Sequence, residues 1–74
     1  MSKLPEVSGM QARKVFQKVG WEFVRVGSSR HMILRKPNHP VALSIPDHKI
    51  LDRGLLRSLI RDAGMSVEEF SSLL

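Results

Sequence analysis

Apolar and polar positions follow helical spacing in the first part of the chain. An apolar stripe with three- and four-residue steps predicts a helix with one buried side. The stripe consists of Met10, Val15, Phe16 and Val19. Ser8 and Gln11 have the spacing of a capping box, so the helix is expected to begin at Ser8. Gly20 is expected to end it, because glycine readily adopts the left-handed conformation that follows many helices.

After Gly20 the pattern changes to short runs bounded by turn residues, which predict strands. The three runs are residues 21–26, 30–36 and 41–45. Their connections are short, at Gly27–Ser29 and at residues 37–40, and this favours an antiparallel meander. Pro46 is expected to stop the third strand and to open a loop over residues 46–51.

Alternation within a strand assigns side chains to its two faces. In the second run Met32 and Leu34 are expected to point inward, which leaves His31, Ile33 and Arg35 on the outer face. The first run alternates imperfectly. Trp21 and Phe23 fall on one side as core and sheet-edge residues, and strict alternation places Arg25 with them.

Two further helices are expected near the end of the chain. Asp52 is a good N-cap residue, and Gly64 closes the helix that it opens. Its expected buried side consists of Leu55, Leu56, Leu59, Ile60 and Ala63. Ser66 and Glu69 form a second capping box before a short last helix. The predicted fold class is α+β, with the order αβββαα and the helices packed on one face of a three-stranded antiparallel sheet.

Length and composition restrict the possible classes of protein. Seventy-four residues are enough for one domain, which we place at residues 1–74. The chain has no cysteine, so disulfides, thiolate zinc sites and a cysteine nucleophile are excluded. No apolar run has the roughly 20 residues of a membrane helix, and no signal-peptide pattern follows Met1. We therefore expect a cytoplasmic protein that does not contact membranes.

The net charge of +5 is concentrated in the first half of the chain. Residues 1–37 carry eight basic and two acidic side chains, whereas residues 38–74 carry four and five. Such a field attracts a polyanion, and the scarcity of aromatic residues favours phosphate contacts over base stacking. The candidate phosphate-binding or RNA-binding residues are Arg25, Ser28, Ser29, Arg30, Arg35 and Lys36, with Lys14 and Lys18 on the first helix. The row Arg53, Arg57 and Arg61 is interpreted as a solvated helix face.

Three histidines are the candidates for proton transfer, because the ordinary pKa of histidine lies near neutrality. From the residues alone, His31 is either a catalytic group or a surface histidine of a basic strand. His48 is a possible auxiliary group, or it only fixes the loop before the second helix, and His39 is interpreted as a solvated turn residue. Their spacing matches no metal-ligand motif, so neither a metal nor another cofactor is expected.

Several short motifs follow one another between Ser8 and Leu74. They are Gly20-Trp21, Val24-Arg25, the turn before His31, Ile45-Pro46-Asp47-His48, the stretch from Gly54 to Ser66, and Glu68-Glu69-Phe70. In their order and spacing, the sequence resembles the HicA toxins of bacterial toxin–antitoxin pairs. The sequence departs from the family in two places. The run Gly27-Ser28-Ser29-Arg30-His31 is longer than the Gly-Ser-His of the family, as if by an insertion before the histidine, and Gly54-Leu55-Leu56 replaces Gly-Thr-Leu.

The resemblance implies a fold like that of double-stranded-RNA-binding domains and metal-independent endonucleolytic cleavage of messenger RNA, with His31 as catalytic residue. It also implies a HicB-type antitoxin partner that covers the active surface, and contact with operator DNA only through the toxin–antitoxin complex. The alternative function is a noncatalytic RNA-binding module that uses the same basic face. A DNA-binding regulator is disfavoured, because no helix-turn-helix signal is present.

Overall fold

The computed structural model describes residues 4–74 and confirms the predicted α+β fold with the order αβββαα. Three antiparallel strands are arranged in the order β1-β2-β3, and a short 3-10 turn, η1, joins the first two. The elements are α1 (Gly9–Lys18), β1 (Glu22–Val26), η1 (Ser28–Arg30), β2 (His31–Arg35), β3 (Leu43–Pro46), α2 (Arg53–Asp62) and α3 (Val67–Ser72). None of these helices has the length and apolarity needed to cross a membrane.

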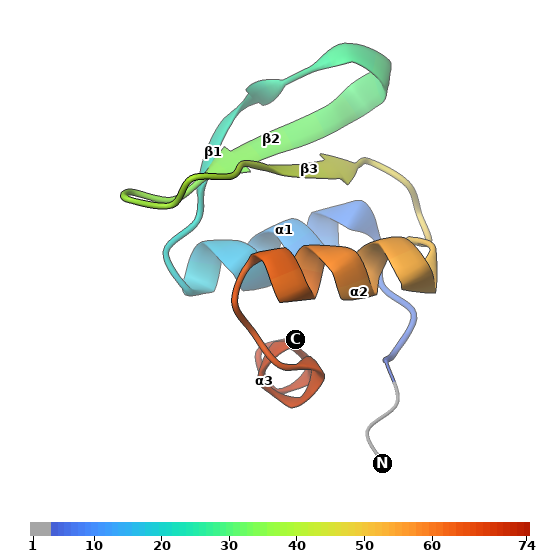
Figure 1. Cartoon of the computed structure of the whole chain (residues 1–74). Coiled ribbons are helices and arrows are strands. Elements are labelled where there is room, and N and C mark those ends of the chain that lie inside the picture. Colours follow the sequence, from blue (N-terminus) through green and yellow to red (C-terminus); the bar gives the residue numbers. More distant parts are fainter. Residues whose placement is uncertain (1–3) are drawn as a thin grey trace.

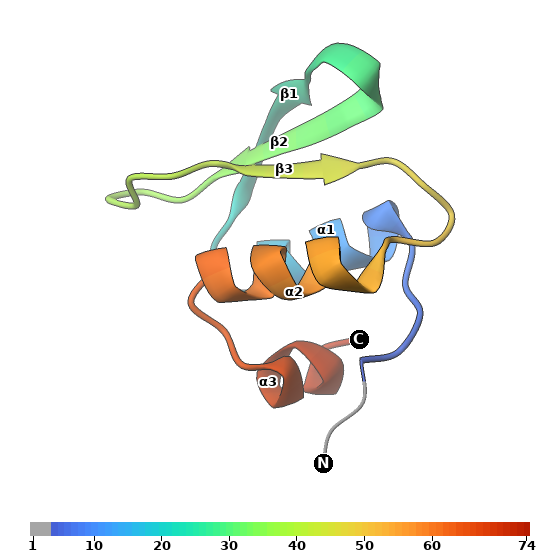
Figure 2. The same ribbon diagram turned by 45° about the vertical axis from the view of Figure 1, so that its right-hand side comes forward.

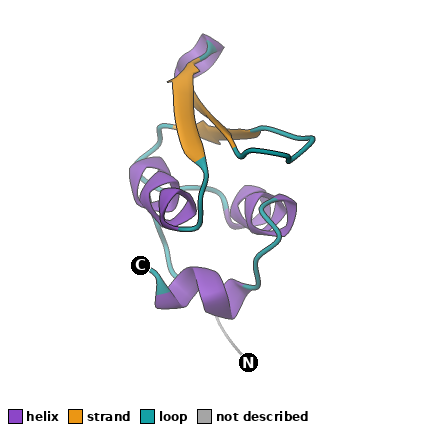
Figure 3. Ribbon diagram, turned by 90° about the vertical axis from the view of Figure 1, so that its left-hand side faces the viewer, coloured by secondary structure: helices purple, strands orange, loops and turns teal. Residues whose placement is uncertain are grey.

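The helices lie on one side of the sheet, in two layers (Figures 1 and 2). Helices α1 and α2 run side by side beneath the sheet, and α3 lies beneath them on the side away from the strands (Figure 3). The end of the β1–β2 hairpin that carries η1 projects beyond the helices (Figures 1 and 2). Within residues 4–74, no second layer covers the outer face of the sheet or the inner side of this hairpin end.

The capping residues predicted from the sequence fix where the helices begin. The Ser8 hydroxyl accepts a hydrogen bond from the Gln11 N–H at 3.0 Å, and the Gln11 side chain accepts one from the Ser8 N–H at 2.8 Å. Ser66 and Glu69 make the same reciprocal pair before α3. Asp52 accepts from the Leu55 N–H at 3.0 Å, which confirms it as the N-cap of α2.

A hydrophobic core lies between the sheet and the helices. Met32 and Leu34 of β2 point into it, as predicted, and Phe16 meets Phe70 with ring centroids 5.4 Å apart. Leu4 and Val7, which precede the first helix, are also buried and were not expected in the core. Their position is held by the backbone, where the Leu51 N–H donates to the Val7 carbonyl at 2.8 Å.

The predicted apolar stripe of α1 is wrong at Met10, whose side chain is 44% exposed. Gly9 and Ala12 are buried instead, because α1 lies against the backbone that follows β3. A Cβ at Gly9 would collide with the carbonyl oxygen of Pro46. The close contact at Gly9 sets the rotation of the helix and directs Met10 toward solvent.

The third strand is shifted relative to its prediction and spans Leu43–Pro46 rather than residues 41–45. Pro46 is its last paired residue, opposite His31, and Val41 is exposed. The interpretation of His39 as only a solvated turn residue is also wrong. Its half-buried ring lies 4.8 Å from the Trp21 ring, and its Nδ1 lies within 3.4 Å of the Val41 backbone nitrogen.

Candidate functional site

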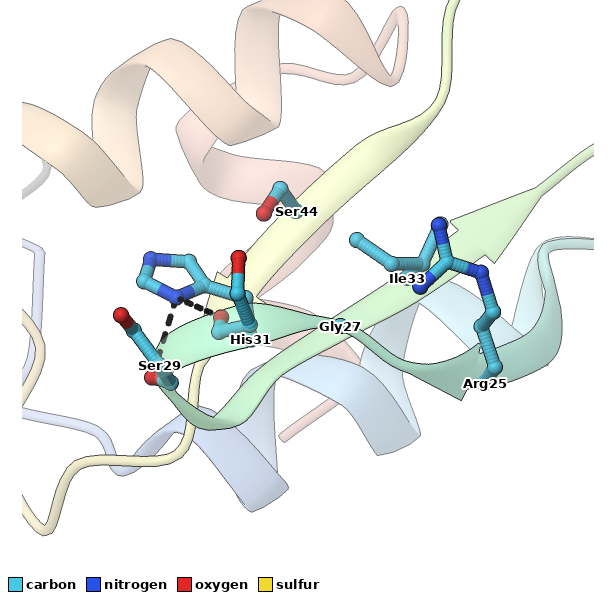
Figure 4. A pocket seen from close by; sticks show the side chains of 7 residues that line it. Arg25, Gly27, Ser29, His31, Ile33 and Ser44 are labelled. Carbon is cyan, nitrogen blue, oxygen red and sulfur yellow. Dashed lines mark hydrogen bonds between the residues drawn. The ribbon is translucent and has the colours of Figure 1, made fainter.

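A hollow of about 370 Å³ opens on the outer face of the sheet, at the projecting end of the β1–β2 hairpin (Figure 4). All three strands and the η1 turn contribute to its wall. The lining residues are Arg25, Gly27, Ser28, Ser29, His31, Ile33 and Ser44. Four of the predicted site residues, Arg25, Ser28, Ser29 and His31, are thus brought together.

His31 is the first residue of β2, and two backbone carbonyls hold its ring (Figure 4). Its Nδ1 lies 3.2 Å from the Ser28 oxygen and 3.1 Å from the Ser29 oxygen. Since both oxygens are only acceptors, these contacts assign the proton to Nδ1. The neutral imidazole then has its lone pair on Nε2, which is the form that can accept a proton from a substrate.

The backbone of the η1 turn brings both carbonyls to the ring. Ser29 and Arg30 have φ angles of 58° and 59°, in the left-handed region that residues with a side chain seldom occupy. The turn is closed by the Gly27 N–H, which donates to the His31 carbonyl at 2.7 Å. Ser29 and Arg30 lie where the sequence is longer than the HicA pattern that it resembles, so the extra length is accommodated in the turn that holds His31.

A bulge in β1 places Arg25 on the same face as His31. Phe23 pairs with Leu34, an inward position, but Arg25 pairs with Ile33, an outward one. The register shifts by one residue between Phe23 and Arg25, and such an extra residue reverses the side to which the next side chains point. The prediction that Arg25 shares a face with Phe23 is therefore wrong.

Arg25 lines the hollow, with its guanidinium beside Ile33 (Figure 4). A Cβ at Gly27 would be 3.3 Å from Nη1 of Arg25 and 3.6 Å from Cγ1 of Ile33, so the glycine leaves room for both side chains. The lining includes one guanidinium and one imidazole, and none of the lining residues is acidic. This composition suits an anionic group such as a phosphate.

Ser44 of β3 is a lining residue that the sequence analysis missed. It pairs with Ile33 and is exposed between two buried neighbours, Leu43 and Ile45. The same alternation that was used for β2 would have found it, because a polar residue between two apolar ones in a strand points outward. Its hydroxyl adds a hydrogen-bonding group opposite Arg25.

The remaining basic candidates lie elsewhere. Arg35 shares the outer face with His31 but is four residues further along β2, and Arg30 lies on the other side of the hairpin, near Arg13 and Asp47. Lys36 packs close to Gly20. Lys14 and Lys18 are on α1, beneath the sheet, where the Lys18 ammonium donates to the Leu73 carbonyl at 2.7 Å.

His48 does not line the hollow, and its side chain is exposed. Its carbonyl oxygen accepts a hydrogen bond from the Gly9 N–H at 2.9 Å, which ties the loop after β3 to the start of α1. Within residues 4–74 no cluster of three or more histidine, cysteine or acidic side chains is placed to hold a metal ion.

Comparison with known proteins identifies the family. A family model described as the HicA toxin of bacterial toxin–antitoxin matches residues 9–65, from the first residue of α1 to just beyond α2. The match covers well over half of the chain and includes every residue of the hollow. No curated protein matches the chain. The chain belongs to the HicA toxin family, the toxin partner of bacterial toxin–antitoxin pairs.

Proposed function

We propose that this protein is an endoribonuclease toxin, a single domain that cleaves messenger RNA at the His31 hollow and is neutralised by a HicB-type antitoxin. The observation that carries the proposal is the way the His31 ring is held. Two carbonyls occupy Nδ1, so Nε2 is available for proton transfer in a hollow that Arg25 also lines. A module that only binds RNA does not need this arrangement.

RNA supplies its own nucleophile, the 2′-hydroxyl next to the scissile phosphate. Nε2 of His31 takes the proton of that hydroxyl as its oxygen attacks phosphorus. The carbonyls of Ser28 and Ser29 stabilise the imidazolium that forms, because Nδ1–H donates to both of them. This route needs no metal ion, since the nucleophile and the base are both already at the site.

The negative charge that grows on the phosphate oxygens is the second requirement. The Arg25 guanidinium offers two parallel donors to such oxygens and lines the same hollow. The Ser28, Ser29 and Ser44 hydroxyls provide further donors around the phosphate or ribose. The bond to the 5′-oxygen breaks, that oxygen takes a proton from the imidazolium or from water, and the products are a 2′,3′-cyclic phosphate and a 5′-hydroxyl.

The experiment compares the wild type with His31→Ala, in growth arrest after induction and in cleavage of purified RNA. We expect His31→Ala to cleave at least about 100-fold more slowly and to permit growth, because general acid–base catalysis contributes this much. Its unfolding midpoint should stay within a few degrees, since only hydrogen bonds of a half-exposed ring are lost. Equal growth arrest by both proteins would contradict the catalytic assignment.

Two further measurements separate the alternatives that the sequence leaves open. If the wild type binds RNA but leaves it intact, the protein is a noncatalytic RNA-binding module. The rate of His48→Ala decides whether His48 assists, because an auxiliary acid or base would cost a comparable factor and a loop residue would not. Mapping the 3′ ends of the products tests the chemistry, since the 2′-hydroxyl route must leave a cyclic phosphate.

A further inference from the structure

A second hollow lies on the opposite side of the β1–β2 hairpin, between its inner face and α1. Its volume is about 430 Å³, and it is lined by Met10, Arg13, Val26, Arg30, Met32 and Asp47. Val26 and Met32 are a pair of inward-facing positions, whereas His31 faces outward. The two hollows are therefore separated by the thickness of the hairpin, and we call this one the inner hollow.

Apolar side chains gather at the inner hollow without a covering layer. Val26 is 58% exposed and Met10 is 44% exposed, although both are large apolar residues. Phe23, further along β1, is also partly exposed. The end of the hairpin that carries η1 rises away from the helices (Figures 1 and 2). Such exposure on so small a protein marks a surface for a partner.

The charges around the inner hollow define what the partner must offer. The Arg13 guanidinium lies 3.9 Å above the Phe23 ring and 3.8 Å from the Met32 sulfur, so it is held at the wall of the hollow. Arg30 lies on the far side, next to Asp47, whose N–H donates to the Arg30 carbonyl at 3.1 Å. Two guanidinium groups with one carboxylate leave a net positive rim around an apolar floor.

We propose that the inner hollow is the docking site for a segment of the antitoxin that inserts a large apolar side chain beside Val26 and Met10 and presents carboxylates to Arg13 and Arg30. An apolar anchor in a pocket with a polar rim is how protein partners gain most of their affinity. RNA fits less well, because no aromatic ring lines this hollow for a base to stack on and the Asp47 carboxylate repels phosphates. The identification of the partner as the antitoxin rests on the proposed function, whereas the shape and the charges of the inner hollow do not depend on it.

At this location, the contact that gives the antitoxin its affinity differs from the contact that covers the outer hollow. A segment in the inner hollow touches neither His31 nor Arg25, which open on the other side of the hairpin. Affinity then comes mainly from the inner side, and the rest of the antitoxin reaches over the η1 turn to cover the outer hollow. Substitutions at the inner hollow should therefore weaken neutralisation and leave RNA cleavage intact.

The test uses the antitoxin, purified as the product of the small gene that the resemblance to HicA toxins predicts beside the toxin gene, and measures its affinity for the toxin. Binding is measured by calorimetry to His31→Ala, which serves as a nontoxic parent, and to the same protein carrying Val26→Glu or Ile50→Glu. Ile50 is the matched control, because it is 61% exposed and lies outside the hollow. We expect Val26→Glu to weaken binding by at least about 30-fold, as loss of an anchor does. Ile50→Glu should change it by no more than about two-fold.

A second pair of measurements uses the toxin with His31 intact. Val26→Glu should still arrest growth and cleave RNA, but co-expression of the adjoining gene should no longer restore growth. Arg30→Asn should make the affinity of the adjoining protein less sensitive to salt, since one charge at the rim is removed. Asparagine is chosen because it tolerates the left-handed backbone at this position.

Three results would overturn the proposal. The first is a dissociation constant for Val26→Glu within two-fold of the parent's, with circular dichroism showing a folded protein. The second is a fold-loss in the RNA cleavage rate of Val26→Glu as large as its fold-loss in affinity for the adjoining protein. That result would assign the inner hollow to RNA. The third is failure of the adjoining protein to bind the parent at all. Failure of the proposed function is distinct from these, because it would be seen as a wild type that does not cleave RNA.

Discussion

The helical side of the molecule and the β1–β2 hairpin differ in how much of each is buried. The helices and β3 supply most of the buried core, whereas no residue of β1 is buried and β2 buries only Met32 and Leu34. The outer hollow with His31 and the inner hollow with Val26 both use this hairpin, one on each side. The hairpin thus buries only two of its side chains and contributes residues to both candidate surfaces.

Backbone strain is distributed in the same unequal way. Where the helical side needs a positive φ it uses glycine, at Gly20 and Gly64. The hairpin instead places Ser29 and Arg30 in the left-handed region, one after the other, directly before His31. Strain of this kind persists where the surrounding structure enforces it, and it is concentrated at functional sites. The helical side therefore mainly stabilises the fold, and the hairpin carries the candidate surfaces. Substitutions in the two regions can test whether stability and function change separately.

The largest effect is expected from a pair of identical substitutions, one in each region. Phe16→Ala removes a fully buried ring that packs on Phe70 and should lower the free energy of unfolding by about 3–5 kcal/mol. Phe23→Ala removes a ring that is 37% exposed beneath Arg13 and should cost about 1 kcal/mol. Urea denaturation measures both. Equal losses would show that the hairpin belongs to the cooperative core, and the contrast between the two regions would fail.

Sequence patterns predicted the helical side well, because capping and periodicity are local signals. Ser8, Asp52 and Ser66 were each assigned as N-caps, and each makes the expected hydrogen bond. The error at Met10 has a nonlocal cause, since the rotation of α1 depends on the contact of Gly9 with a loop far away in the sequence. Hydrophobic spacing contains no information about such a contact.

The candidate site was predicted only in part, and the missing part is also nonlocal. His31 was assigned to the outer face correctly, because β2 alternates regularly. Arg25 was assigned to the wrong face, since the bulge between Phe23 and Arg25 arises from pairing with β2 and has no mark in the sequence of β1. The carbonyls that hold the His31 ring also escaped prediction, because backbone oxygens are not distinguished by residue type.

The next effect in size is expected at Arg25. Arg25→Ala should lower kcat/KM for RNA by about 10–100-fold, the loss of a charge-assisted hydrogen bond to the phosphate, with little change in unfolding. Arg25→Lys should restore part of the rate, because a lysine keeps the charge but not the two parallel donors. Arg57→Ala is the control on the helical side, where an exposed arginine of the same charge lies on α2. If Arg57→Ala reduces the rate equally, the effect is one of net charge and does not belong to the hollow.

The smallest effect is expected from exchanging the residue types at two positions of positive φ, Ser29 in the hairpin and Gly64 after α2. Ser29→Gly should raise the free energy of unfolding by up to about 1 kcal/mol, because the relief of the left-handed backbone exceeds the entropy that glycine adds to the unfolded chain. The reciprocal change Gly64→Ser should lower it by about 1–2 kcal/mol, since nothing lies within 4 Å of the added Cβ and only the backbone penalty remains.

Rates of RNA cleavage show whether the positive φ at each of these two positions matters for function. Gly64→Ser should cleave RNA at the parent rate under conditions where it is folded, because Gly64 follows α2 and does not line the hollow. Ser29→Gly should cleave about two- to five-fold more slowly despite its added stability, since the Ser29 hydroxyl is lost from the hollow and a freer backbone holds the carbonyls less firmly against Nδ1 of His31. A Ser29→Gly protein that is both more stable and faster would show that the strain serves neither the ring nor the reaction. The hairpin would then differ from the helical side only in exposure.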